Sequence, residues 1–238
     1  MKDLSDFTPR PRPGTAVLTG EHVRLEPYDA ARHGQGLADC LVADTSGETW
    51  RYMPFDFSDP ATFPEEFANR VSTQGWAAYT ILDRQTSEPL GTASYMRQRP
   101  EHGSVEVGCV AFSPALRKTP AASEAIYLMA AHVFDDLGYR RFEWKCNNAN
   151  QASRRAAVRF GFRFEGIFRN DMVAKGENRD TAWYAMTDDD WPGVKIAFQR
   201  WLSPSNFDAS GQQLMSLSVL QAAQARIAPA HQHQQDQQ

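Results

Sequence analysis

Hydrophobic and polar residues follow two different patterns along this chain, and each pattern predicts a different kind of element. In residues 22–28 and 104–112 about every second residue is apolar, which is typical of strands with one buried face. Residues 119–138 instead place apolar side chains three and four positions apart, which predicts a long amphipathic helix. Gly138 follows the last apolar turn and is expected to end that helix.

The same patterns predict the other elements. Strands are expected over 76–83, 90–98, 140–146, 162–169 and 180–187, and helices over about 30–43, 61–74, 150–160 and 191–202. Strands dominate the first half, and strand–helix units follow in the second half. This order predicts an α/β fold in which helices cover a mixed sheet.

Composition divides the chain into three parts. Residues 1–14 are rich in Pro and Arg and are expected to form a flexible arm. Residues 15–203 show no break in composition and are predicted to be one domain. Residues 204–238 are predicted to be a Gln-rich, disordered tail, with a short helix possible around 211–227.

Charge and cysteine content narrow the functional classes. The net charge of −4 disfavours DNA as a ligand, because general nucleic-acid binders are usually basic. Cys40, Cys109 and Cys146 lack the spacing of a disulfide framework or a zinc site, which favours a reducing cytoplasm. His231 and His233 lie in the polar tail, where a metal site is not expected. No signal peptide and no apolar run of membrane-spanning length is recognised, so no membrane partner is expected.

Two stretches carry polar residues in patterns that indicate a binding site. In the first, the strand over 104–112 runs into a loop with Arg117 and Lys118 and then into the long helix. The free N–H groups at the start of such a helix bind phosphate well, although the two cations are also explained as solvated loop residues. In the second stretch, residues 147–166, a polar turn leads into a helix, and helix capping alone accounts for its Asn and Ser residues.

Together these stretches resemble the GCN5-related N-acetyltransferases (the GNAT superfamily), and most closely its RimJ/RimL-type branch. The resemblance covers roughly residues 17–203 and rests on the motif LGY-R-R…N-x-x-S-R-R…GF-x-x-EG. It implies a mostly antiparallel sheet with splayed central strands. It also implies acetyl-CoA as co-substrate, no metal, and direct acetyl transfer in a ternary complex to a primary amine, either a protein N-terminus or a small amine. A monomer or a homodimer is expected.

The resemblance also implies which residues bind acetyl-CoA. In the family, the backbone of one central strand pairs with the pantetheine, a loop holds the pyrophosphate, and the following polar turn contacts the rest of the cofactor. Pro120 replaces the usual glycine of the loop and has no N–H to donate. The implied residues are Val110, Ala111 and Phe112 on the strand, Arg117, Lys118, Thr119, Ala121, Ala122 and Ser123 in the loop and helix start, and Asn150, Ser153 and Arg155 at the second turn.

Glu106 is the candidate catalytic residue. Many family members take the proton of the amine with a glutamate on this strand, and the alternation Val105-Glu106-Val107 turns Glu106 away from the two valines. A structural ion pair is the alternative role. The family's usual general-acid tyrosine is replaced by Ala157, and neither Tyr127 nor Tyr184 is preferred in its place.

Aromatic residues in the N-terminal half are candidates for the acceptor pocket, although core packing is the more frequent role for any one of them. They are Trp50, Tyr52, Phe55, Phe57, Trp76 and Tyr79. The departures at Pro120 and Ala157 leave a second class of function open, a non-catalytic acyl-CoA-binding or interaction module.

Overall fold

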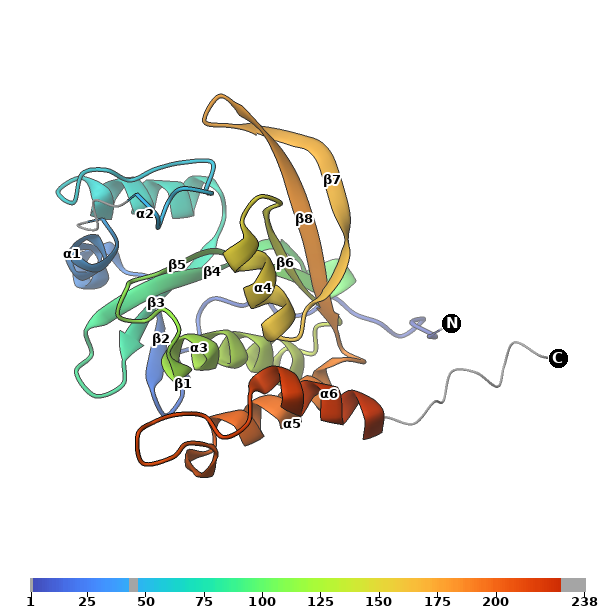
Figure 1. The fold of residues 1–238 in the computed structure, drawn as a ribbon. Coiled ribbons are helices and arrows are strands. Elements are labelled where there is room, and N and C mark those ends of the chain that lie inside the picture. Colours follow the sequence, from blue (N-terminus) through green and yellow to red (C-terminus); the bar gives the residue numbers. More distant parts are fainter. Residues whose placement is uncertain (1, 43–46, 228–238) are drawn as a thin grey trace.

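One sheet of eight strands organises the molecule (Figure 1). It is seen in a computed structural model of the protein, which describes residues 2–42 and 47–227. The strands are β1 (Leu18–Thr19), β2 (Val23–Pro27), β3 (Ala77–Asp83), β4 (Pro89–Arg99), β5 (Ser104–Phe112), β6 (Arg141–Asn147), β7 (Arg163–Ala174) and β8 (Glu177–Thr187), in the spatial order β1-β2-β3-β4-β5-β6-β8-β7. Among the described strands, only β5 and β6 are parallel neighbours, so the predicted α/β fold with a mixed, mostly antiparallel sheet is confirmed.

Helices cover both faces of this sheet and enclose two cores. On one face the main core holds Val105 and Val107 of β5 together with residues of the C-terminal helices. On the other face a second core is built by the two N-terminal helices, which Figure 1 shows at the opposite side of the sheet. The helices are α1 (Ala30–Leu41), α2 (Phe63–Thr73), α3 (Pro120–Ala131), α4 (Gln151–Arg159), α5 (Trp191–Leu202) and α6 (Leu217–Ile227), with short 3-10 turns at Pro100–His102 and Pro204–Asn206.

The long helix predicted over 119–138 has two parts. Thr119 caps the N-terminus of α3, since its side chain accepts the N–H of Ala122. After Ala131 the chain continues as a π-helical turn, His132–Asp136. Gly138, with φ of +68°, then reverses the chain, as predicted for a residue that must adopt the left-handed conformation.

Glu124 of α3 fixes the first hairpin against this helix. Its carboxylate accepts three consecutive backbone N–H groups, from Glu21 at 2.9 Å, His22 at 2.7 Å and Val23 at 2.9 Å. Charge-assisted hydrogen bonds of this kind are stronger than neutral ones. The carboxylate therefore holds β1 and β2 at a fixed place beside the main core.

The hairpin of β7 and β8 is longer than the strands predicted over 162–169 and 180–187. Ala174 pairs with Glu177, so Lys175 and Gly176 form a two-residue turn. Both turn residues have positive φ, 53° and 80°, as a type I′ turn requires. The extension was not predicted, because its residues are mostly polar and exposed, and a polar run of this kind is typical of a loop.

Both chain ends depart from their predicted behaviour. The arm over 1–14 has no regular structure from residue 2 on, but it is held to the domain: the N–H of Arg10 donates to the carbonyl of Pro100 at 3.0 Å. At the other end, Leu217 and Leu220 of α6 are buried in the main core. The prediction of a disordered tail over 204–238 is therefore wrong up to residue 227, because α6 buries an apolar face, whereas the short helix considered around 211–227 is found as α6. Residues 228–238, with His231 and His233, lie outside the described part.

Over the ranges 2–42 and 47–227, no helix is both long and apolar enough to cross a membrane.

Candidate active site

The two parallel strands separate halfway along their length and leave a V-shaped gap. β5 and β6 pair only from Ser104 with Arg141 to Val107 with Trp144. Beyond that point β5 continues to Phe112 and pairs with β4 alone. Because peptide groups of a strand alternate between its two edges, about half of those in residues 108–112 face the gap. Val110, Ala111 and Phe112, predicted to bind the pantetheine, all lie on this free edge.

The loop after β5 brings a helix N-terminus to the mouth of the gap. Lys118 is exposed and has φ of +62°. No acceptor among the described residues takes the backbone N–H groups of Lys118 and Ala121. Free N–H groups and the helix dipole both favour an anion here.

Several of the predicted donors at this helix start are already used inside the protein. The Thr119 hydroxyl donates to the carbonyl of Leu116 at 2.7 Å and accepts the N–H of Ala122. The Ser123 hydroxyl is buried and accepts a hydrogen bond from Arg159 at 2.8 Å. The loop therefore offers fewer free donors than the sequence suggested.

Arg117 is turned back onto the protein. Its Nε donates to the carbonyl of Phe112 at 2.8 Å, and one terminal nitrogen donates to the hydroxyl of Thr49 at 2.6 Å. The side chain thus ties the loop to the segment that precedes α2. Contact between Arg117 and a phosphate stays a prediction, and such contact requires the guanidinium to leave at least one of these bonds.

The second polar turn is a helix cap. Asn150 accepts the N–H of Ser153 and so caps α4, as the sequence predicted. The Ser153 hydroxyl accepts a hydrogen bond from the indole of Trp144 at 3.0 Å. Arg155 is exposed. A role of these residues in cofactor binding remains a prediction, because capping already accounts for Asn150.

Glu106 is buried at the point where β5 and β6 separate. It is only 1% exposed, and its Oε2 lies 3.2 Å from Nζ of Lys145 and 3.9 Å from Nε of Arg97. Burial raises the pKa of Glu106 to about 7, and the two cations oppose that shift. A carboxylate with such a pKa can exchange a proton near neutral pH, which suits a general base.

Gly108 leaves room beside this carboxylate. A Cβ atom at position 108 would lie 2.9 Å from Oε1 of Glu106 and would collide with the Met96 side chain. The carboxylate thus lies against the first residue of the splayed part of β5. A reactive group held in the gap would be close to it.

Lys145 and Arg97 were missed by the sequence analysis. Lys145 was within reach, because the alternation in Phe142-Glu143-Trp144-Lys145 places the charged residues on one face of β6 and the aromatic residues on the other. Arg97 had no such signal, since only the fold brings it to Glu106. Its guanidinium lies 4.7 Å from the ring centre of Trp183, which is also a near neighbour of Lys145.

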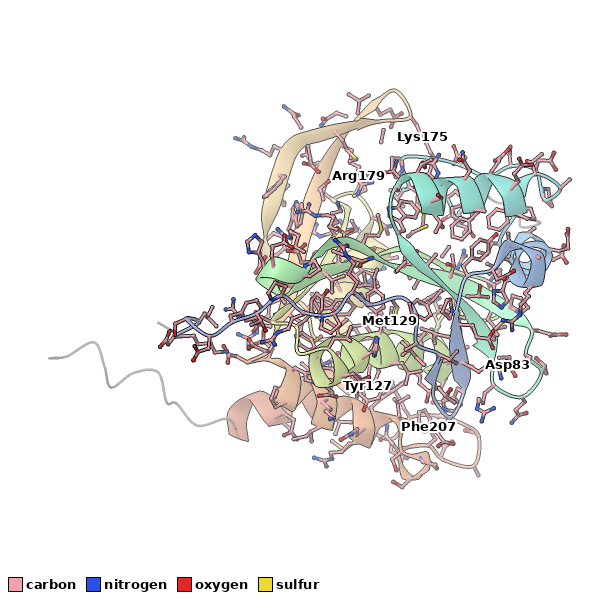
Figure 2. The ribbon with its side chains drawn as sticks, turned by 180° about the vertical axis from the view of Figure 1, so that it is seen from behind. Asp83, Tyr127, Met129, Lys175, Arg179 and Phe207 are labelled. Carbon is pink, nitrogen blue, oxygen red and sulfur yellow. The ribbon has the colours of Figure 1, made fainter. Side chains whose placement is uncertain are left out.

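The extended hairpin closes one side of the Glu106 face. Lys175 at its turn donates to the carbonyl of Trp50 at 2.9 Å and pairs with Asp56, and Arg179 donates to the carbonyl of Tyr52 at 3.3 Å. Figure 2 shows both cationic side chains in the space between the hairpin and the α2 region. Segments far apart in the sequence thus enclose the site together.

Most of the aromatic residues predicted near the acceptor side serve packing. Trp50 and Phe57 are buried in the second core, and Tyr79 is buried in the main core. Trp76 is different, since with Arg12, Tyr28 and Gln98, among others, it lines a hollow of about 470 Å³.

Neither Tyr127 nor Tyr184 replaces the absent general acid at the Glu106 face. Ala157 is fully buried. Tyr184 pairs with Trp144, whereas Lys145, which contacts Glu106, pairs with Trp183. Because successive side chains of a strand point to opposite faces, the Tyr184 side chain lies on the face away from Glu106. Tyr127 packs against Trp191 and Phe198.

Within the described ranges, no three His, Cys, Asp or Glu side chains are grouped closely enough to hold a metal ion.

Comparison with known proteins identifies the family. Residues 23–163 match the family model of the acetyltransferase (GNAT) domain. A GCN5-related N-acetyltransferase from Brucella melitensis is similar in structure, with 40% identity, a TM-score of 0.85, and coverage of 92% of this chain and 100% of that one. A probable GNAT-family acetyltransferase from Chromobacterium violaceum has 38% identity and a TM-score of 0.75 over 81% of this chain and 96% of its own.

A curated relative carries the same description. The uncharacterised N-acetyltransferase YoaA of Bacillus subtilis is 30% identical over 122 residues, which are 51% of this chain and 68% of YoaA. The family match covers more than half of the chain and includes the splayed strands and the start of α3. The chain belongs to the GNAT family of N-acetyltransferases.

Proposed function

We propose that this enzyme transfers the acetyl group of acetyl-CoA directly to a primary amine in a ternary complex, with Glu106 as the general base. The observation that carries the proposal is the position of Glu106, a buried carboxylate at the apex of the gap with a pKa raised to about 7. The acceptor is a protein N-terminus or a small amine, as in the RimJ/RimL-type branch that the sequence motif resembles.

The residues around the gap fit acetyl-CoA. The free edge of β5 over 108–112 offers alternating N–H and C=O groups to the pantetheine amides. The unpaired N–H groups of Lys118 and Ala121, together with the Lys118 ammonium, offer donors to the pyrophosphate. Pro120 removes one donor from this loop but starts the helix with a favourable φ.

The protein itself carries out one proton transfer in this reaction. When bound, acetyl-CoA supplies a thioester whose carbonyl carbon forms the new C–N bond, while its C–S bond breaks and the electron pair leaves on sulfur. Glu106 accepts the proton that the amine nitrogen loses. Solvent supplies the proton for the sulfur, because Ala157 has no acidic hydrogen. The products are an acetamide and CoA.

A covalent acyl-enzyme is disfavoured by the state of the thiol on β5. Cys109 follows Gly108 in a bulge of β5, with φ of +47°. Burial raises the pKa of Cys109 to about 12, so the thiol is protonated at neutral pH and is a weak nucleophile. This supports direct attack by the amine.

Location in the cytoplasm is part of the proposal. The three cysteines Cys40, Cys109 and Cys146 are all free, as expected in a reducing compartment.

Turnover and binding together test the proposal. Isothermal calorimetry should detect acetyl-CoA binding, and thiol release should appear with one or more members of an acceptor panel of N-terminal peptides, polyamines, amino acids and aminoglycosides. The departures at Pro120 and Ala157 keep one alternative, a non-catalytic acyl-CoA-binding module. That alternative predicts binding without thiol release for every amine, and such a result would reject the catalytic proposal.

A further inference from the structure

A second buried charge lies on the Glu106 side of the sheet, and the mechanism above does not use it. Arg179 of β8 is 8% exposed. One terminal nitrogen donates to the Tyr52 carbonyl at 3.3 Å, but the buried Nε donates to no acceptor. No carboxylate of the described residues forms an ion pair with this guanidinium within 4.0 Å. Burial lowers the pKa of Arg179, in keeping with the missing partner.

Three other arginines, which are only partly buried, have partners for their charge. Arg99 meets Glu143 at 2.6 Å, and Arg141 meets Glu165 at 2.5 Å. Arg159 has no carboxylate but lies over Trp201, 4.8 Å from the ring centre, and donates to Ser123. A buried charge without such partners is costly, so an anion that enters beside Arg179 offsets part of that cost.

The surroundings of Arg179 carry an excess of positive charge. Trp183 lies on the same face of β8, four positions along, and its ring meets Arg97 and Lys145. Arg179, Arg97 and Lys145 thus accompany a single Glu106 carboxylate. Glu143 adds little negative charge, because it is held by Arg99 and by Arg141 at 2.7 Å. Asp171 is close enough to act on Arg179 electrostatically, but it is exposed and forms no ion pair with it.

We propose that Arg179 binds a carboxylate of the acceptor, so that the acceptor class is an amine that carries a carboxylate near its amino group, such as an amino acid. The proposal rests on the proposed acetyl transfer. A planar guanidinium with free N–H groups suits two-point binding of a carboxylate. The chain as a whole carries a net charge of −4, but the local charge of the site favours an acidic acceptor.

The same cations assist the reaction at the amine. A positive surrounding lowers the pKa of an ammonium group, so more of the acceptor arrives as the neutral amine that can attack. Glu106 is the nearby group that takes the remaining proton. Arg179 orients the substrate and does not touch the reacting atoms, so it is a specificity-determining residue.

Matched acceptors test this inference. Thiol-release kinetics would compare amino acids with their amides and with the amines that lack the carboxyl carbon, for example lysine, lysinamide and cadaverine. The wild-type enzyme should prefer the carboxylate in kcat/KM by about 10- to 100-fold, the range expected for a charged hydrogen-bonded pair. Arg179→Met should abolish that preference, mainly through KM, and Arg179→Lys should restore part of it.

Arg169→Met is the matched control. Arg169 lies on the other strand of the same hairpin, is exposed, and lines a separate hollow with Asn170, Asn178 and Asp180. Its replacement should leave the preference unchanged. Melting curves show whether each variant is folded, and the wild-type comparison decides the question even if Arg179→Met does not fold.

A direct binding measurement removes the dependence on turnover. Calorimetry on the CoA-saturated protein would compare N-acetylglycine with N-acetylglycinamide, and the carboxylate should bind at least about tenfold more tightly in the wild type only. Equal kcat/KM for acids and amides, equal binding of the two probes, or a preference that survives Arg179→Met overturns the inference. Thiol release with amines that lack a carboxylate then leaves the proposed function intact, whereas a protein that does not bind acetyl-CoA removes the function itself.

Discussion

Nζ of Lys145 on β6 lies 3.2 Å from Oε2 of Glu106 on β5, next to the point where the two strands separate. The parallel register brings them together, because Glu106 pairs with Glu143 and Lys145 is two positions further along the same face. The pair has two opposing effects on Glu106. Burial favours the neutral acid, while the lysine charge favours the carboxylate.

Replacing Glu106 by Gln tests its role as the base. Glu106→Gln should lower kcat by about 10²–10⁴-fold, the usual contribution of a general base. Acetyl-CoA affinity should change little, because the cofactor is proposed to contact β5 through backbone beyond Gly108. Steady-state kinetics on the best acceptor, paired with a melting curve, measures both. Near-normal turnover with a lowered melting temperature would assign Glu106 a structural role only.

The pH dependence of stability gives an independent test of the buried carboxylate. The folded pKa of Glu106, about 7, lies above its ordinary value of 4.5, so between these pH values the folded state binds more protons than the unfolded state. Stability contributed by this group is therefore present below about pH 4.5 and is lost as the pH rises through 7, by up to ~3 kcal/mol. Glu106→Gln should abolish that loss. The difference in melting temperature between the variant and the wild type should thus grow in the variant's favour from pH 5 to pH 8.

Lys145 sets the working pH of the proposed base. Lys145→Met removes the cation that opposes burial, so the pKa of Glu106 should rise above 7 and the acidic limb of the kcat/KM profile should move to higher pH. Lys145→Arg keeps the charge and is the matched control, with a limb close to that of the wild type. If the acidic limb does not move in Lys145→Met, that limb does not report the protonation of Glu106.

The strands and the functional residues on them could be predicted where a local sequence pattern indicates them. The alternation Val105-Glu106-Val107 separated Glu106 from the two core valines, and the apolar spacing over 119–138 predicted the long helix that begins with α3. The rest of the site depends on tertiary contacts that no local sequence pattern indicates. Arg97 reaches it from the neighbouring strand β4, and Arg179 reaches it from β8, far along the sequence. The turn at Lys175, which lets the hairpin extend this far, lies among polar residues.

Among the residues predicted to bind phosphate, Arg117 departs most from the expected arrangement, because its side chain already donates to Phe112 and Thr49. Arg117→Glu should weaken acetyl-CoA binding by at least about 1.5 kcal/mol if the side chain meets the pyrophosphate, because a favourable charged contact becomes a repulsive one. Thr49→Val removes only the bond at 2.6 Å between Thr49 and Arg117 and should leave affinity unchanged or slightly higher. Calorimetry with acetyl-CoA measures both variants. Unchanged affinity in a folded Arg117→Glu protein would show that Arg117 serves the loop and not the cofactor.

The last prediction concerns α6, which the composition of the C-terminal region concealed. Leu217 is 0% exposed and contributes to the main core beside α5, so Leu217→Ala should lower the free energy of unfolding by about 2–5 kcal/mol, the usual result of removing a buried leucine side chain. Leu214 lies three residues earlier and is 65% exposed, so Leu214→Ala should change stability by less than about 0.5 kcal/mol. Urea unfolding followed by tryptophan fluorescence measures both. Equal stability of the two variants would return the domain boundary to residue 203, because α6 would then contribute nothing to the core.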